Sequence, residues 1–387
     1  MSPRQDIAAA RRIVIKLGTG VVTHPGAGLA LGRLCSLVES VAGVHRQGRE
    51  VVIVSSGAVG MGQRTLGLHQ RPDSLGLRQA CAAVGQGQLI ALYTQAFAQF
   101  GVKVAQVLLT QDDLADRDRA LCVRTTLTRL LELSVVPILN ENDSVSVREL
   151  IEHRRTQGVD GPAPWFGDND GLSARVAVAL AADLLILFTD VDGLHTANPA
   201  TDPDARRIPE LAEIDEPTLA RAAGTSAGGT GGMYSKLNAA ALATRSGVAV
   251  LITSAHAPRA LERSLAGEDL GTLVVPARKS QQRRQIATWA ASHGALIVND
   301  GALTALAWRK ASLLPIGLVR VDGEFSAGDV VEIRDGSGRV HGRGLVNYDA
   351  SDCRLLAGRH SNEITSILGW RGYDALITRD NMVLSEV

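Results

Sequence analysis

Aromatic residues are scarce in this chain, since Phe, Trp and Tyr make up only 3% of its 387 residues. Ala, Val, Leu and Gly must therefore supply most of the packing, which suits helices and sheets layered in close contact. The chain also lacks an excess of charge, because 40 Lys and Arg residues balance 40 Asp and Glu residues. A balanced charge gives no general attraction to nucleic acid or to a membrane surface.

Cysteine is rare as well, and the four cysteines show no zinc-site spacing. We expect them to be buried, reduced thiols, which are typical of cytosolic proteins. The nine histidines show neither HxH nor HExxH spacing, so they predict no metal site. The cysteines are Cys35, Cys81, Cys122 and Cys353.

Long apolar runs are also missing. No segment approaches the roughly 20 apolar residues of a membrane helix. Met1 to Arg12 is polar and lacks the apolar core of a signal peptide. We therefore predict a cytoplasmic protein that does not bind membranes.

The length and the periodicity of the chain predict two domains. Short β-branched runs alternate with helical periodicity, which is typical of an open, mainly parallel sheet in an αβα sandwich. After Ser280, short strands and frequent turns predict a small β-barrel. We place the domains at residues 1–279 and 280–387. The strands expected in the first domain are Ile13–Leu17, Val51–Val54, Val102–Leu109, Val135–Leu139, Leu184–Phe188 and Val248–Ile252.

Polar residues and glycines recur where these strands end. Ligands of open α/β sheets bind outside the carboxyl ends of the strands. We therefore expect several separate loops to build one site at this edge of the sheet. The loops are Gly18-Thr19-Gly20, Ser55-Ser56-Gly57, Asn140-Glu141-Asn142-Asp143 and Thr189-Asp190.

Two lysines lie beside glycine loops. Lys16 closes an apolar strand, and a lysine is costly to bury unless its charge is paired. Lys236 follows the glycines of 228–232 in the first turn of an expected helix, where backbone N–H groups bind phosphate. Both lysines therefore indicate an anion site. The alternatives are a Lys16 that extends its amine to solvent and a glycine loop that is only a surface hinge.

The segment Trp165–Ala174 predicts a tight loop that opens a helix. It places Asp168, Asn169 and Asp170 between two glycines and before an apolar run. Such a group can hold an amino group or organise lysines around a phosphate. A solvated turn is the alternative.

No general base accompanies the lysines, and this favours a carboxylate acceptor. A hydroxyl nucleophile needs help in losing its proton. A carboxylate with a pKa of about 4.3 is already ionised at neutral pH. Its repulsion from the triphosphate can be offset by two lysines and Mg²⁺. The residues therefore favour phosphoryl transfer to a carboxylate.

Taken together, the motifs resemble the glutamate 5-kinase family of the amino-acid kinase superfamily. The C-terminal part is similar to a PUA domain at Gly294–Gly301 and Ser312–Val319. The segments that carry the kinase resemblance are Ile15–Thr19, Val54–Ala58, Asn140–Asp143, Phe166–Ala174, Thr189-Asp190 and Gly229–Leu237. Ser235 stands where the family usually has Thr, which keeps the hydroxyl.

The resemblance implies that ATP and L-glutamate give L-glutamyl 5-phosphate and ADP, the first step of proline synthesis from glutamate. Mg²⁺ would accompany ATP. Lys16 and Lys236 would be catalytic, with Asp170 holding them and Asp168 shaping the loop. The residues implied to bind glutamate are Ser56, Asp143 and Asn169. Those implied to bind ATP are Lys16, Thr189, Asp190, Thr230, Gly231, Gly232, Met233, Tyr234, Ser235 and Lys236.

The resemblance also implies partners. It predicts a homo-oligomer (dimer or tetramer) and feedback inhibition by proline near the long link from Asp143 to Gly167. Because the acyl phosphate product is labile, we also expect its hand-over to a reductase. RNA binding by the PUA domain is not favoured, because residues 278–387 hold 14 basic and 12 acidic residues, a difference of +2. A kinase of acetylglutamate or aspartate is the nearest alternative.

Overall fold

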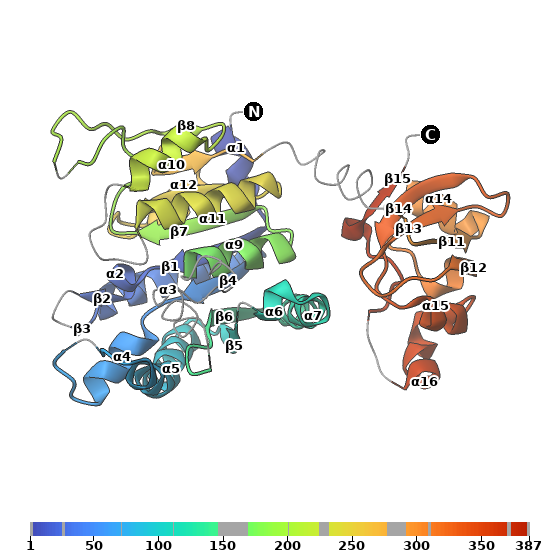
Figure 1. The fold of residues 1–387 in the computed structure, drawn as a ribbon, viewed down its shortest axis with the longest axis horizontal. Coiled ribbons are helices and arrows are strands. Elements are labelled where there is room, and N and C mark those ends of the chain that lie inside the picture. Colours follow the sequence, from blue (N-terminus) through green and yellow to red (C-terminus); the bar gives the residue numbers. More distant parts are fainter. Residues whose placement is uncertain are drawn as a thin grey trace, which may run out of the picture. The chain divides into compact units, whose positions relative to one another are not determined.

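The computed structural model divides the chain into two compact units, Met1–Ala277 and Arg278–Val387. Figure 1 labels the helices and strands of each unit. The structure describes residues 3–24, 28–70, 72–110, 112–145, 169–199, 201–223, 232–276, 292–308, 311–369 and 373–384. Among them no helix is both long and apolar enough to cross a membrane.

The first unit is built on an eight-stranded sheet with the order β5-β6-β4-β1-β7-β9-β10-β8. Every pair in it is parallel except β9 with β10. The predicted open, mainly parallel sheet is therefore confirmed. The strands are β1 (Arg12–Leu17), β4 (Glu50–Ser55), β5 (Lys103–Leu109), β6 (Val135–Glu141), β7 (Leu184–Thr189), β8 (Glu210–Leu211), β9 (Ala249–Ser254) and β10 (Thr272–Val274). A separate two-stranded ribbon joins β2 (Thr23–His24) and β3 (Gly28–Leu29).

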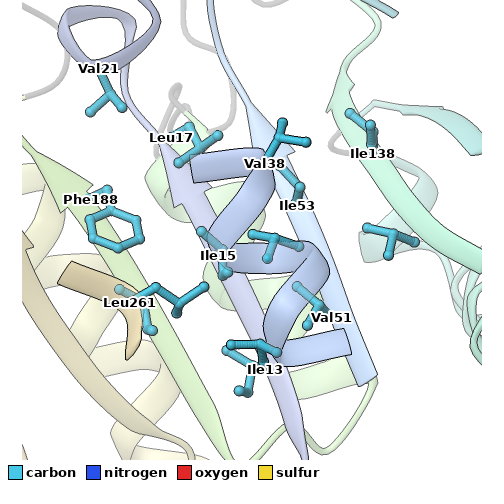
Figure 2. Packing of buried hydrophobic residues seen from close by; sticks show 14 of the residues in the cluster. Ile13, Ile15, Leu17, Val21, Val38, Val51, Ile53, Ile138, Phe188 and Leu261 are labelled. Atoms are coloured by element: carbon cyan, nitrogen blue, oxygen red, sulfur yellow. The ribbon is translucent and has the colours of Figure 1, made fainter. Parts of the chain in front are cut away.

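One face of the sheet is covered by α1, α3, α5 and α12. Ile13, Ile15 and Leu17 of β1 lie on this face, and Figure 2 shows them beneath a helix that carries Val38, with Leu261 nearby. These side chains are fully or almost fully buried. The helices are α1 (Pro3–Ala8), α3 (Leu31–Arg46), α5 (Leu75–Ala98) and α12 (Ala260–Leu265).

The other face is covered by α7, α9 and α11. Val14 packs in this second core with residues of all three helices. Because successive side chains of a strand point to opposite faces, Lys16 lies on the same side as Val14. The sheet is thus covered on both faces, as predicted for an αβα sandwich. These helices are α7 (Arg117–Glu132), α9 (Asn169–Ala179) and α11 (Met233–Arg245).

Short helices follow the strands at the carboxyl edge of the sheet. Gly57 connects β4 to α4 with φ +113°, in the left-handed region that a residue with a side chain rarely adopts. This sharp reversal keeps Ser55 and Ser56 at the edge. The remaining helices of the unit are α2 (Thr19–Val22), α4 (Ala58–Thr65), α6 (Asp112–Ala115) and α10 (Glu216–Ala223).

All four cysteines are free thiols, but the prediction that they are buried is wrong for two of them. Cys81 and Cys353 are buried, whereas Cys35 and Cys122 are exposed. The reason is helix periodicity, because Cys35 and Cys122 lie on the outer faces of α3 and α7. Both helices turn a different stripe toward the sheet.

The second unit has its own core around a five-stranded mixed sheet with the order β12-β11-β13-β14-β15. Leu296, Val331, Ile333 and Leu376 are fully buried in it. The strands are β11 (Gly294–Val298), β12 (Leu318–Gly323), β13 (Val330–Arg334), β14 (Val340–Leu345) and β15 (Met382–Leu384). The helices are α14 (Asp300–Trp308), α15 (Ala350–Leu356) and α16 (Ile364–Leu368). The 3-10 turns are Pro315–Gly317, Ser361–Glu363 and Arg379–Asn381.

Candidate active site

Three charged side chains from three elements meet at the carboxyl edge of the large sheet. Lys16 Nζ at the end of β1 lies 2.6 Å from Asp170 Oδ1. Lys236 Nζ in the first turn of α11 lies 3.3 Å from Asp170 Oδ2. Ser235 Oγ donates to the same Oδ2 over 3.2 Å. One carboxylate therefore holds two ammonium groups, and the three charged side chains carry a net charge of +1.

These charges are buried, which raises the energetic importance of their pairing. Lys16 is 4% exposed, Lys236 6% and Asp170 0%. Burial opposes the ionisation of Asp170, but the charges of Lys16 and Lys236 outweigh it and hold the pKa of that carboxyl below its ordinary value of 3.8. Asp170 therefore stays ionised at neutral pH. It also lies in the first turn of α9, where a negative charge is favoured by the helix dipole.

Space beside this triad is left open by a glycine. A Cβ atom on Gly18 would come 3.5 Å from Lys16 Nζ and 3.6 Å from Phe188 O. Because Gly18 has no side chain, a ligand can approach the Lys16 ammonium from this loop. Gly18 thus lies next to the Lys16 ammonium.

Asn169 is the centre of a second, neutral cluster. Its Nδ2 donates to Ser56 Oγ over 2.8 Å, to Asn140 Oδ1 over 3.0 Å and to Ser55 O over 3.2 Å. Two of these acceptors are carbonyl oxygens, so the amide orientation is fixed. Among the described residues nothing donates to Asn169 Oδ1, although this atom is buried. A buried acceptor without a donor indicates a ligand that supplies one.

A buried hydrogen bond between Ser55 and Tyr93 lies next to this cluster. The Oγ of Ser55 lies 2.8 Å from the hydroxyl of Tyr93, and both residues are fully buried. Burial raises the pKa of the Tyr93 hydroxyl, which therefore stays protonated. This hydrogen bond joins β4 to α5 at the residue before Ser56.

The residues expected at the nucleotide lie at the ends of β7 and α11. Thr189 ends β7, and its Oγ1 donates to Asp190 Oδ1 over 2.9 Å. Since β7 pairs with β1, Thr189 lies at the same sheet edge as Lys16. Gly232 precedes α11, and Met233 and Tyr234 open it, Tyr234 being 45% exposed. Thr230, Gly231 and Asp168 lie outside the described residues.

Asp143 lies at the same edge but in a separate turn. This turn follows β6, where Asn142 N donates to Leu109 O over 2.8 Å. Asp143 is partly exposed there. The structure thus brings Ser56 and Asn169 into direct contact and places Asp143 in the neighbouring loop.

The described residues contain no cluster of three or more His, Cys, Asp or Glu side chains able to hold a metal ion. Asp170 is already shared by two lysines, which makes it a poor metal ligand.

Sequence reasoning did not assign a role to Asn140 or Gln86. Asn140 Nδ2 donates to Gln86 Oε1 over 2.8 Å, and Asn140 Oδ1 accepts from Asn169. Asn140 lies in a polar loop that the sequence marks at the end of an apolar strand, but only Asp143 of that loop was expected to bind the substrate. Gln86, in the middle of α5, carries no such signal.

The chain matches two family models. Residues 11–254 match the model described as amino acid kinase family, and residues 294–368 match the PUA domain. The first match covers seven of the eight strands of the large sheet, all but β10, together with Lys16, Lys236 and Asp170. The second lies within the small C-terminal unit.

Similar proteins extend the match to almost the whole chain. The glutamate 5-kinase of Carboxydothermus hydrogenoformans is 43% identical over 385 residues, covering 98% of this chain and 99% of the relative. That of Geobacter sulfurreducens is 44% identical over 382 residues, covering 98% of both chains. That of Moorella thermoacetica is 44% identical over 384 residues with the same coverage. The chain therefore belongs to the glutamate 5-kinase family, within the amino acid kinase family.

Proposed function

We propose that this protein transfers the γ-phosphoryl group of ATP to the side-chain carboxylate of L-glutamate, giving L-glutamyl 5-phosphate and ADP. The observation that carries the proposal is the buried triad in which Asp170 holds Lys16 and Lys236. Membership of the glutamate 5-kinase family supports the same reaction. We assign the catalysis to residues 1–279 and regard residues 280–387 as a PUA domain.

The chemistry follows from the charges. A glutamate carboxylate oxygen attacks the γ-phosphorus, the new carboxyl O–P bond forms, and the bond to the β,γ-bridging oxygen breaks. The electron pair of that bond leaves with ADP. No proton moves, because the acceptor is already ionised. Lys16 and Lys236 reduce the repulsion between carboxylate and triphosphate, and Asp170 keeps both ammonium groups in place before the substrates arrive.

In this proposal Asn169 binds the amino group of the substrate. Its buried Oδ1 has no donor among the described residues, and an α-ammonium would supply one. Ser56 and Asp143 complete the glutamate site in this proposal. An N-acetylated substrate has a bulky amide in place of the ammonium, so we favour glutamate over acetylglutamate.

ATP is assigned to the opposite side of the triad. Its site is formed by Thr189 and Asp190 at the end of β7, by both lysines, and by residues before and at the start of α11. The residues around the start of α11 are Thr230, Gly231, Gly232, Met233, Tyr234 and Ser235. Mg²⁺ enters bound to ATP, since the described residues contain no acidic cluster that would hold it alone.

The product is an acyl phosphate, which hydrolyses readily. We therefore propose a reductase that consumes it as a partner, and proline synthesis from glutamate as the pathway. Proline inhibition, a homo-oligomer and a cytoplasmic location belong to the same proposal. A simple check of hand-over is whether added reductase reduces hydrolysis of the intermediate.

For the PUA domain we propose a structural or regulatory role. Its charge difference of +2 is far from the basic footprint of RNA-binding domains. A gel-shift assay with a salt titration tests this. Tight binding that weakens with salt would show that the domain binds RNA.

The proposed reaction is tested by trapping the product. Purified protein, ATP, Mg²⁺ and hydroxylamine should give a hydroxamate with L-glutamate and much less with N-acetylglutamate or aspartate. No hydroxamate from glutamate would disprove the proposal. Equal turnover of N-acetylglutamate would favour the alternative kinase.

A further inference from the structure

We propose that Gln86 is a positioning residue for the amino group of the substrate, acting through Asn140 and Asn169. This inference rests on the proposed function, because it concerns the same glutamate site. Gln86 itself need not touch the substrate. Its effect is to stabilise, together with the Ser55 backbone carbonyl, the orientation in which Asn169 Oδ1 faces the ligand.

The side-chain amides of Gln86, Asn140 and Asn169 are linked by hydrogen bonds that all donate in the same direction, from Asn169 toward Gln86. Asn140 Nδ2 donates to Gln86 Oε1 over 2.8 Å, and Asn169 Nδ2 donates to Asn140 Oδ1 over 3.0 Å. Each amide has one donating and one accepting end. Gln86 therefore stabilises one orientation of the Asn140 amide, and Asn140 stabilises the matching orientation of Asn169, beside the backbone contacts that both amides make. The chain ends on Asn169 Oδ1, the buried acceptor that has no donor among the described residues.

The direction of the chain matters for the ligand. If Asn140 turned over, its Nδ2 would face the Nδ2 of Asn169, and two donors would meet. Asn169 would then have to turn as well and present an N–H group to the substrate. An N–H group repels an ammonium ion, whereas Oδ1 accepts a hydrogen bond from it. The orientation therefore decides whether the site selects an amino acid.

Two hydrogen bonds to the backbone favour the same orientation of the Asn140 and Asn169 amides. Neither of them provides an acceptor for Asn140 Nδ2, which is the part that Gln86 plays. Glu141 N donates to Asn140 Oδ1 over 2.9 Å, and Asn169 Nδ2 also donates to Ser55 O over 3.2 Å. Only Gln86, among the described residues, accepts from Asn140 Nδ2. Asn140 is 3% exposed, so water is a poor substitute for that acceptor.

Gln86 is held in place by a close contact between two helices. A Cβ atom on Gly85 would come 1.8 Å from Ala58 O, and one on Gly62 would come 1.8 Å from Cys81 O. The backbones of α4 and α5 therefore touch at these glycines. Because α4 starts directly after Ser56 and Gly57, the same contact fixes Gln86 relative to the glutamate loop.

The test compares substitutions that keep the size of the side chain. Gln86→Met removes the acceptor, and we expect the KM for glutamate to rise about tenfold or more, since a lost hydrogen bond at a charged group has that order of effect. The KM for ATP and the kcat should change by less than about threefold. Inhibition by glutarate, which has no ammonium group, should stay nearly constant.

Two variants serve as controls. Gln86→Glu keeps an acceptor for Asn140 Nδ2, so the KM for glutamate of this variant should stay within about threefold of the parent value. Gln88→Met makes the same change on the exposed side of the same helix, where Gln88 Oε1 accepts from Thr65 over 2.8 Å. It should leave the KM for glutamate unchanged. Thermal melting confirms that each variant is folded.

The outcomes separate the two proposals. If the parent protein makes no hydroxamate from glutamate, the proposed function fails. If the parent is active but Gln86→Met leaves the KM for glutamate unaltered, only the role of Gln86 is overturned. A rise in the KM for glutamate and the inhibition constant of glutarate by the same factor would also overturn it, because general damage to the site would then explain the result.

Discussion

At the scale of single residues, the site depends on how one carboxylate balances two lysines. Asp170 is fully buried and pairs with both Lys16 and Lys236. Buried ammonium groups without a counter-charge are strongly unfavourable. Asp170 therefore has a structural task and a catalytic task at once, because the lysines that it holds are those proposed to meet the phosphoryl group.

Replacing Asp170 with Asn should damage both stability and catalysis. The amide cannot balance the ammonium groups, so we expect the free energy of unfolding to fall by about 3 kcal/mol or more. The kcat should fall by about 100-fold or more, since the lysines lose their fixed positions. Urea unfolding and the hydroxamate assay measure the two effects. Asp112→Asn, an exposed carboxylate at the start of α6, is the matched control and should change neither.

The effect of Asp170 should depend on pH in one direction. Its folded pKa lies below the ordinary 3.8, so its contribution to stability is present above that value and is lost as the pH falls through the folded pKa. The stability difference between the parent and Asp170→Asn should thus be constant down to about pH 4 and then shrink. A difference that grows in acid would contradict the depressed pKa.

Only some of these residues could be predicted from the sequence. Lys16 is conspicuous because it stands in an apolar strand. Asp170 could be assigned to the lysines only through the family resemblance, because 66 positions separate it from Lys236. Gln86 could not be found at all, since a glutamine in the middle of a helix is normally exposed. Its role depends on a contact with a strand that the helix pattern does not specify.

At the scale of elements, the contact between α4 and α5 is as important as the strands. We predict that Gly85→Ala destabilises the protein, because its Cβ would come 1.8 Å from Ala58 O and the helices would have to separate. The expected loss is about 3 kcal/mol, with a raised KM for glutamate because Gln86 moves too. Chemical unfolding and steady-state kinetics provide the measurements.

A neighbouring glycine offers the control for this prediction. Nothing lies within 4 Å of a Cβ added to Gly87 in the same helix. Gly87→Ala should therefore stabilise α5 by about 0.5–1 kcal/mol and leave the kinetics unchanged. If both alanine variants behaved alike, the close helix contact would be wrong.

The amphipathic helices also predict the reactivity of the thiols. Cys35 and Cys122 are exposed on α3 and α7, whereas Cys81 and Cys353 are buried. Burial raises the pKa of the Cys353 thiol to about 12, which suppresses its thiolate form. A disulfide reagent should thus react rapidly with two thiols of the folded protein and with all four after unfolding. Fast reaction of all four in the folded state would contradict the assigned helix faces.

The pattern of strands and helices could be predicted well because its periodicity is local. Strands such as β7 are nearly continuous apolar runs, and the predicted positions of the strands are confirmed. The order of strands in the sheet could not be read from that periodicity. It places β1 between β4 and β7, and so brings loops that are far apart in sequence to one edge.

At the scale of the whole molecule, the two units have separate hydrophobic cores. All the residues proposed for catalysis and for substrate binding belong to the first unit. We therefore predict that residues 1–277 alone fold and retain kinase activity within about tenfold of the full chain, because these residues all lie in the first unit. Circular dichroism and the hydroxamate assay test this. A folded but inactive fragment would show that the PUA domain contributes to the site.

The central claim is that a substrate carboxylate, without a general base, attacks the γ-phosphorus. It is tested most directly with L-glutamate labelled with ¹⁸O in its side-chain carboxylate, in the presence of ATP, Mg²⁺ and hydroxylamine. Hydroxylamine displaces phosphate at the carbonyl carbon, so the released phosphate should carry one ¹⁸O atom from the carboxylate. Hydroxamate formation with unlabelled phosphate would contradict the account, because the bond between the carboxylate oxygen and phosphorus would never have formed.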